Sequence, residues 1–192
     1  GEIYESPDDL LRRVAKAIAA AELNYDTARA AEQWESTFYH MLSELTFLPN
    51  SPTLMNAGTN SGQLSACFVL PVKDNMADIF TTLKHAALIQ QSGGGTGYNF
   101  SNLRHRGALI KETGGTSSGP LSFIDIFDHA TENIRQGGKR RGANMGILNV
   151  DHPDIMDFIR AKSREGAFRN FNFSVGVTDS FMQAVEREED WP

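Results

Sequence analysis

The chain has 192 residues, 40% of them hydrophobic and 22% charged, with a formal net charge of −6 at pH 7, which suits a soluble globular fold. The negative balance argues against a nucleic-acid partner, and the apolar runs are too short to cross a membrane. The only cysteine, Cys67, excludes an internal disulfide framework, and we expect a cytoplasmic protein.

The amino-terminal stretch is predicted to be helical. Ser6 is a favourable N-cap, Pro7 suits the first helical position, and two acidic residues follow in the first turn. A second helix is expected from Asp26 or Thr27 to about Leu45, with an apolar stripe along one side. These two helices should form a small helical layer.

Strands and helices alternate in the rest of the chain. The run 48–63 is rich in proline, glycine and small polar residues, so we expect an irregular loop there. The further elements expected, in chain order, are a short buried strand at 65–72, a helix from about 78, a glycine-rich run at 92–97, another at 113–120, a helix after it, a strand at 145–150, a helix at 152–164, a strand at 170–177 and a helix from 178 or 179. This order predicts an α/β fold with a largely parallel sheet. Three or four strands are few for a complete barrel, which indicates a part of something larger.

Two glycine-rich runs are candidates for phosphate binding. The sequence QGGKRRGANMG at 136–146 sets three consecutive cations between glycines, and exposed backbone amides together with cations suit an anion. The alternative is a solvated basic loop, which is the commoner role of a charge run. The run SGGGTG at 92–97 is either a ligand loop or a helix C-cap, and it matches neither a Walker A loop nor a full dinucleotide motif.

Cys67 lies in an apolar stretch, where a lone cysteine is usually an inert core residue. A functional role would need a second thiol, a base or a metal. The acidic residues around His152 are better interpreted as helix capping than as metal ligands, so no metal site is expected.

Four segments together resemble the large catalytic chain of the ribonucleotide reductases, most closely the adenosylcobalamin-dependent class. They are LPNSPTLMNAGT…GQLSACFVLPV (48–72), SGGGTGYNFSNLR (92–104), GGTSSGPLSFIDIFD (114–128) and QGGKRRGANMGILNVDHPDI (136–155). The resemblance implies an α/β fold in which an N-terminal helical region, 1–47, precedes the first part of a ten-stranded α/β barrel at 48–192, incomplete in this chain.

The resemblance also implies roles for individual residues. Cys67 matches the first of two redox cysteines that reduce the ribose 2′ carbon. Residues 107–119 match a first specificity loop, and residues 136–143 match a second one, which passes the identity of the effector to the substrate. The implied substrate-binding residues are Ser51, Thr53, Ala66 and Gly95; the effector-binding residues are Asp74, Arg106, Lys139 and Arg140; the remaining residues of the second loop are Gln136, Gly137, Gly138, Arg141, Gly142 and Ala143.

The chain departs from the family pattern in what it lacks. It has no Asn-Pro-Cys-Gly-Glu type motif to supply a thiyl radical and no second redox cysteine. We therefore expect a ribonucleoside-diphosphate reductase chain that is inactive alone, although the motifs by themselves leave diphosphate and triphosphate substrates open. A complementary C-terminal chain or segment would supply the radical cysteine and most contacts to adenosylcobalamin. The assembled enzyme would be a homo-oligomer that binds a ribonucleotide substrate and a deoxynucleoside triphosphate or ATP effector.

Two other functions fit the same features. One is a non-catalytic deoxynucleotide-binding regulatory module, which would need the glycine-rich and basic loops but no radical chemistry. The other is an interaction protein whose half barrel serves only as a dimer surface.

Overall fold

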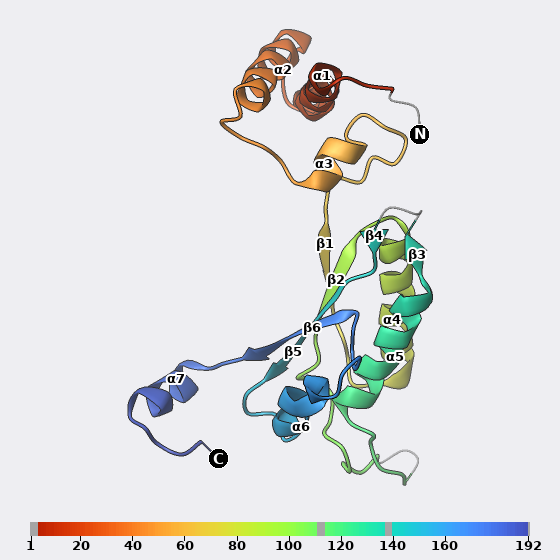
Figure 1. The fold of residues 1–192 in the computed structure, drawn as a ribbon, viewed down its shortest axis with the longest axis vertical. Helices are drawn as coiled ribbons and strands as arrows, with labels where there is room; N and C mark the ends of the chain where they lie inside the picture. The colour runs from red at the N-terminus through yellow and green to blue at the C-terminus, as the bar shows by residue number, and fades with distance from the viewer. Residues whose placement is uncertain (1–3, 111–113, 137–139, 192) are drawn as a thin grey trace. The chain divides into compact units, whose positions relative to one another are not determined.

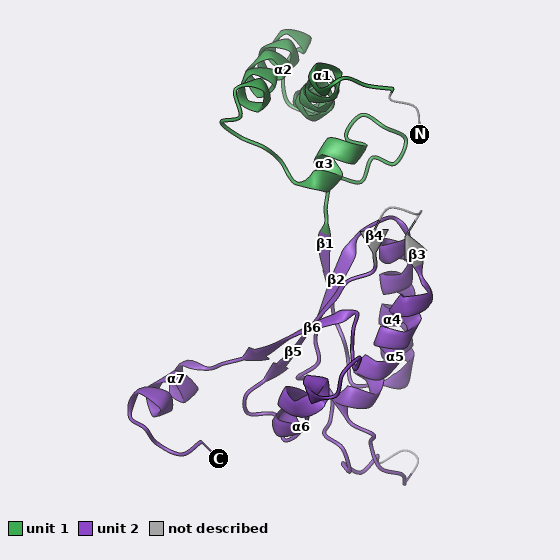
Figure 2. Ribbon diagram, in the orientation of Figure 1, with its two compact units in different colours: residues 1–66 green, residues 67–192 purple. Residues whose placement is uncertain are grey.

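A computed structural model describes residues 4–110, 114–136 and 140–191, and the chain divides into two compact units, residues 1–66 and 67–192 (Figure 2). None of the helices in the described ranges combines the length and the apolar character that a membrane crossing requires.

The first unit is helical, as predicted. Ser6 begins the first helix with a reciprocal pair of hydrogen bonds, since its hydroxyl accepts from the Asp9 amide and its own amide donates to the Asp9 carboxylate. Thr27 caps the second helix through the Ala30 amide. The elements are α1 (Pro7–Ala19), the 3₁₀ helix η1 (Ala20–Asn24), α2 (Ala28–Ser43) and α3 (Ser51–Asn56).

The helix α3 corrects the expectation of an irregular loop at 48–63. The Asn50 side chain accepts a hydrogen bond from the Thr53 amide and so starts a short helix inside the proline-rich run. Arg13 of α1 then donates to the carbonyl oxygens of Leu54 and Ala57. Because of these bonds the segment after residue 47 packs with the helices of the first unit, and the boundary between the units falls between residues 66 and 67 of the chain.

The second unit is built on a four-stranded parallel sheet in the order β1-β2-β5-β6, which confirms the predicted α/β fold (Figure 1). A two-stranded antiparallel ladder, β3-β4, precedes β5. The elements are β1 (Cys67–Leu70), α4 (Met76–Gln91), β2 (Gly95–Asn99), α5 (Pro120–Asn133), β3 (Arg135–Gln136), β4 (Arg140–Arg141), β5 (Asn144–Asn149), α6 (Ile155–Arg160), the 3₁₀ helix η2 (Ala161–Ser163), β6 (Phe171–Gly176) and α7 (Asp179–Glu186). The predicted helix at 152–164 is thus shorter, because α6 ends at Arg160 and tightens into η2.

Helices α4 and α5 lie against each other beside the sheet (Figure 1) and cover one of its faces. The core between them is largely aromatic. Tyr98 contacts Phe127 edge-to-face with ring centroids 5.0 Å apart, and Phe158 stacks on Phe173 at 4.3 Å. The hydrophobic core therefore packs against only one face of the sheet, the face that the helices cover.

The other face of the sheet is open in this chain. Residues paired in register on neighbouring parallel strands share a face, so Cys67 lies beside Gly95, and Gly97 beside Met145. Cys67 is exposed and Val69 is 86% exposed, whereas Phe68 packs toward α4. The expectation of a buried strand at 65–72 is therefore wrong on this face, because no helix in the described part of the second unit covers it.

Candidate functional site

The amino-terminal ends of the parallel strands lie side by side and form the edge of the sheet that runs across the strands. Predicted functional residues of the second unit lie close together at this edge. Cys67 opens β1, Gly95 opens β2, and the two are partners in register. Thr96 follows Gly95 on β2. It is the register partner of Asn144 on β5, and its amide donates a hydrogen bond to the Ala143 carbonyl at 3.0 Å. The predicted redox cysteine, one predicted substrate glycine and the end of the second specificity loop are thus adjacent.

The thiol of Cys67 is exposed on the open face of the sheet. Its neighbour on β2 is Gly95, which has no side chain, so the surface beside the sulfur is bare backbone that a ligand can approach closely. The interpretation of Cys67 as a buried core residue is therefore wrong, and its chemical role stays a prediction.

The predicted second specificity loop, 136–143, includes most of the β3-β4 ladder, in which Arg135 pairs with Arg141 and Gln136 with Arg140. Gly137, Gly138 and Lys139 lie outside the described residues. Gly142 is buried where the loop returns to the sheet. A Cβ at this position would lie 2.6 Å from Thr131 Cγ2, so the close approach of the loop to α5 requires glycine.

Beneath this edge lies a buried polar cluster that the sequence analysis did not identify. Gln90 Nε2 donates to Thr96 Oγ1 at 2.9 Å and to Asn144 Oδ1 at 2.8 Å, and the Tyr98 hydroxyl donates to Thr96 Oγ1 at 2.8 Å. Asn144 Nδ2 in turn donates to Thr131 Oγ1 at 2.8 Å. Burial raises the pKa of Tyr98 to about 12, so its hydroxyl stays protonated and remains a donor. We name Gln90, Thr96, Tyr98, Thr131 and Asn144 the edge cluster.

The predicted effector residues Asp74 and Arg106 have different partners in the structure. The half-buried Asp74 carboxylate accepts from Arg104 Nε at 2.7 Å and from the Arg104 amide at 3.2 Å. Arg106 Nη2 donates to Asp157 Oδ2 at 2.8 Å, and both of these side chains are largely exposed. The structure thus adds Arg104 to the charged groups near the predicted effector residues.

The first specificity loop, 107–119, is described except at 111–113 and is closed at its root. The Gly107 amide donates to the Ser117 carbonyl, and the Ser117 amide donates to the Ala108 carbonyl, each at 2.8 Å. Gly119 has φ +80°, and a Cβ there would lie 2.8 Å from Asp154 Oδ2. Asp154 Oδ2 accepts a hydrogen bond from the Arg106 amide at 2.9 Å, so the carboxylate that anchors Arg106 also leaves no room for a side chain at Gly119.

The buried His152 serves the same anchor. Its Nδ1 accepts from the Asp154 amide at 3.0 Å, so Nε2 carries the proton and donates to the Leu103 carbonyl at 2.9 Å. The helix α6 begins at Ile155, and its N-cap residue Asp154 makes no side-chain capping hydrogen bond, so the capping interpretation is wrong at this helix. In the described part of the chain no three His, Cys, Asp or Glu side chains gather in a way that would hold a metal ion.

The remaining predicted substrate residues belong to the first unit. Ser51 is exposed at the start of α3, and Ala66 is half-buried at the end of the unit. Thr53 is buried, and its hydroxyl lies 2.5 Å from Asn50 Oδ1 and 3.1 Å from the Leu64 carbonyl. The Thr53 hydroxyl therefore ties α3 to the segment that leads into β1.

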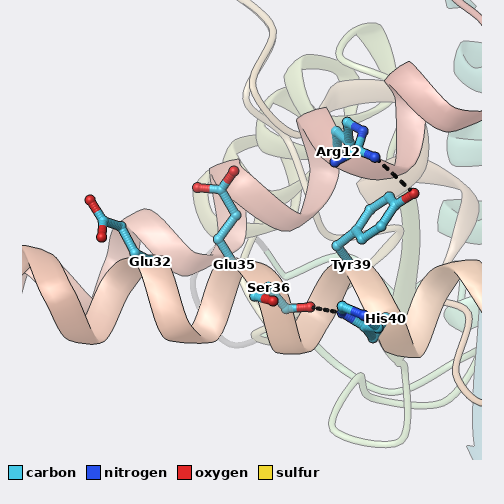
Figure 3. A pocket seen from close by; sticks show the side chains of 6 residues that line it. All are labelled: Arg12, Glu32, Glu35, Ser36, Tyr39 and His40. Atoms are coloured by element: carbon cyan, nitrogen blue, oxygen red, sulfur yellow. Dashed lines mark hydrogen bonds between the residues drawn. The ribbon is translucent and has the colours of Figure 1, made fainter.

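The first unit also carries a polar notch on α1 and α2 (Figure 3), lined by Arg12, Glu32, Glu35, Ser36, Tyr39 and His40. The Arg12 guanidinium lies 4.1 Å from the centroid of the Tyr39 ring, and it also pairs with Asp8. The positive charge of Arg12 is thus already paired within the first unit. A separate apolar groove lies along Val14, Ile18 and Phe38.

A helical unit followed by parallel strands, with a cysteine at the sheet edge, is the architecture of the start of an α/β-barrel chain. The chain belongs to the ribonucleotide reductase family: residues 1–62 match the model of its all-alpha domain, and residues 65–192 match the model of its barrel domain.

Two curated relatives and one solved structure illustrate the likeness. The chain is 50% identical, over 97% of its length, to a vitamin B12-dependent ribonucleoside-diphosphate reductase of Mycobacterium tuberculosis, of which it covers 27%. It is 57% identical, over 83% of its length, to an enzyme of that name from Thermoplasma acidophilum, of which it covers 21%. The fold matches a class Id ribonucleotide reductase alpha subunit of Actinobacillus ureae with a TM-score of 0.80 at 22% identity, covering 98% of this chain and 33% of that one. The chain therefore spans about a quarter of the curated relatives' length.

Proposed function

We propose that the chain is the amino-terminal part of the catalytic chain of a ribonucleoside-diphosphate reductase, and that Cys67 is one of two thiols that reduce the substrate. The observation that carries this proposal is the position of Cys67: its thiol is exposed on the open face of the sheet, beside the bare backbone of Gly95 and near the end of the 136–143 loop.

The chemistry needs a second thiol. Reduction at the ribose 2′ carbon removes the hydroxyl as water and takes two electrons and two protons, which a pair of thiols supplies as it becomes a disulfide. Cys67 is the only cysteine in the sequence, so its partner comes from the rest of the enzyme. The radical cysteine also lies outside this chain, and for both reasons the 192 residues alone are expected to be inactive.

The curated relatives are named as vitamin B12-dependent enzymes, and we propose that the assembled enzyme uses adenosylcobalamin to begin the radical reaction. The described residues do not fit this cofactor. The polar notch and the apolar groove both lie in the first unit, away in sequence from the barrel strands that carry Cys67. We therefore assign the cofactor to the part of the enzyme outside this chain.

We further propose that a deoxynucleoside triphosphate or ATP acts as an effector at the two specificity loops, with Asp74, Arg106, Lys139 and Arg140 as contacts. Arg106 supports this role, because its side chain is 70% exposed at the root of the 107–119 loop. Its present ion pair with Asp157 is exposed and worth about 0–1 kcal/mol, so a phosphate group can compete for the guanidinium.

The open face of the sheet supports a complementary partner. A parallel sheet is normally covered on both faces, and the described chain covers only one. We propose that the rest of the barrel, as a further segment or a separate chain, covers the other, and that the assembled enzyme is a homo-oligomer.

Substitution of Cys67 tests the proposed catalytic role. In the assembled reductase, Cys67→Ser should abolish multiple-turnover formation of deoxynucleotide with a protein thiol reductant, because the serine cannot form the disulfide. Ser65→Ala, two residues earlier and also exposed, is the control and should retain activity. Full activity of Cys67→Ser would contradict the role of Cys67.

A nucleotide-sensing module is the second candidate, favoured by the single cysteine alongside the glycine-rich and basic loops. Titration of the 192-residue chain with deoxynucleoside triphosphates tests both functions. Arg106→Ala should weaken effector binding about ten-fold, the value of one charge-assisted hydrogen bond. Arg169→Ala is a matched control, since Arg169 is 69% exposed and also pairs with an exposed carboxylate. Binding without turnover in any assembly would favour the sensing module, and equal effects of the two variants would contradict the role of Arg106.

A further inference from the structure

Gln90 is the one member of the edge cluster whose hydrogen bonding is incomplete in the described structure. The residue is 1% exposed in the last turn of α4, and both hydrogens of its Nε2 are used, toward Thr96 and Asn144. Its Oε1 is buried without a hydrogen-bond partner among the described residues. A buried acceptor without a donor is unfavourable, so this atom calls for a physical explanation.

The orientation of the Gln90 amide follows from its neighbours. The Thr131 hydroxyl donates to the Phe127 carbonyl at 2.8 Å, so it must accept from Asn144 Nδ2. Asn144 therefore turns its Oδ1 toward Gln90, which must present its NH₂ group. Exchanging the two ends of the Gln90 amide would set two acceptors against each other. Oε1 is thus directed away from the cluster for a structural reason.

The unpaired oxygen faces the end of the second specificity loop. A Cβ built on Gly142 would lie 3.3 Å from Gln90 Oε1, so the backbone of the loop passes next to this atom. On its other side Gln90 holds Thr96, which directly follows Gly95, the predicted substrate residue beside Cys67. Gln90 therefore touches both the returning loop and the strand that carries the candidate substrate site.

We propose that Gln90 is a positioning residue that couples the 136–143 loop to β2, because its Oε1 accepts a backbone N–H of residues 140–143 when an effector changes the conformation of the loop. The inference rests on the proposed control of specificity by an effector and adds the residue that transmits it. In the described conformation Gln90 Oε1 has no hydrogen-bond donor, which raises the free energy of this conformation. The loop is therefore biased toward a conformation in which one of its amides donates to Oε1. The bond then fixes Gln90, and through Nε2 it fixes Thr96 and the neighbouring Gly95.

The test measures substrate preference in the assembled reductase. The ratio of kcat/KM for a purine and a pyrimidine ribonucleoside diphosphate is determined with and without a deoxynucleoside triphosphate effector. Gln90→Met keeps the length of the side chain and removes the acceptor together with the two hydrogen bonds that Nε2 donates to Thr96 and Asn144. It should reduce the effector-induced change in this ratio at least about two- to ten-fold, the value of the one hydrogen bond to Oε1. Tyr98→Phe is the matched control, because it removes the hydrogen bonds from the Tyr98 hydroxyl to Thr96 and Asn144 in the same cluster and leaves Gln90 Oε1 in place.

The outcomes separate the two proposals. An effector response in the wild type and in Tyr98→Phe, but a reduced one in Gln90→Met, supports the coupling. Equal losses in both variants, or none in Gln90→Met, overturn it and leave the proposed function standing. A wild type whose preference ignores every effector overturns the proposed control of specificity as well.

Hydrogen exchange decides the question if Gln90→Met does not fold. In the wild-type reductase the amides of residues 140–143 should exchange more slowly with effector than without it, since one of them gains a buried acceptor. The amides of β6 serve as the internal reference. Unchanged exchange at 140–143 overturns the proposal.

Discussion

At the scale of single residues, the edge of the sheet depends on Gly142. The position needs glycine because of the neighbour that a side chain would meet: a Cβ would lie 2.6 Å from Cγ2 of Thr131, a β-branched residue held in the buried face of α5. A buried, stiff methyl group cannot move aside without disturbing the core. The close contact between loop and helix therefore fixes where the loop ends.

Gly142→Ala should lower the free energy of unfolding by about 1–3 kcal/mol, as overpacking usually does. Gly97→Ala is the control, since the nearest atom to a Cβ there is 3.6 Å away, and it should cost less. Thr131→Ser removes the opposing methyl group, so it should recover part of the loss in a double-mutant cycle. Urea unfolding of the 192-residue chain gives these values, and equal losses for the two alanine variants would contradict the argument.

The character of these residues was only partly predictable from the sequence. The motifs singled out Cys67 and Gly95, but a cysteine in an apolar run looks buried, and its exposure depends on which face of β1 the helices cover. No sequence pattern indicates the role of Gln90, because its partner Thr96 lies on the next strand and its partner Asn144 is 54 residues away. Only the sheet register brings these side chains together.

At the scale of elements, the local rules predicted the helices well. Ser6, Thr27 and Thr178 cap α1, α2 and α7 where the sequence indicated, because an N-cap depends on neighbours within three residues. The helix α3 was missed, since its proline and small polar residues are typical of loops. The strand predicted at 170–177 is one residue shorter at each end, since β6 spans Phe171–Gly176. Phe171 lies in the core and Phe173 packs against it, whereas Val177 falls beyond the strand and is 53% exposed.

The contact between α1 and α2 should make the first unit sensitive to acid. A hydrogen bond from Tyr39, with a second from Arg12, holds the pKa of Asp8 below its ordinary value of 3.8. As the pH falls, Asp8 is therefore protonated at a higher pH in the unfolded chain than in the folded chain. The contribution of Asp8 to the free energy of unfolding is present above about pH 4. It is lost as the pH falls through the lower pKa that Asp8 has in the folded state.

Thermal unfolding of the 192-residue chain between pH 6 and pH 2 tests this contact. Asp8→Asn should unfold at a lower temperature than the wild type at pH 6, and the difference should shrink as the pH falls and Asp8 becomes protonated in the folded state as well. Glu32→Gln removes a negative charge from the same unit as a control. A difference for Asp8→Asn that stays constant over the whole range would show that the carboxylate does not act through its ionised form.

At the scale of the whole molecule, the chain is a helical unit followed by four parallel barrel strands that are covered on one side. The family models match both units in order, and the curated relatives are about four times as long. The open face presents the thiol of Cys67, and the helical side holds the edge cluster that supports the second specificity loop. In the proposed function, the chain provides one reducing group and the apparatus of specificity, and the rest of the enzyme provides the other thiols.

The most direct measurement is the fate of Cys67 during one turnover. The assembled reductase is given substrate and cofactor without an external reductant, free thiols are then blocked by alkylation, and the peptides are analysed by mass spectrometry. We expect Cys67 in a disulfide with a cysteine from outside this chain, in an amount that matches the deoxynucleotide formed. Deoxynucleotide formation with Cys67 still fully alkylated would contradict the proposed role of this residue.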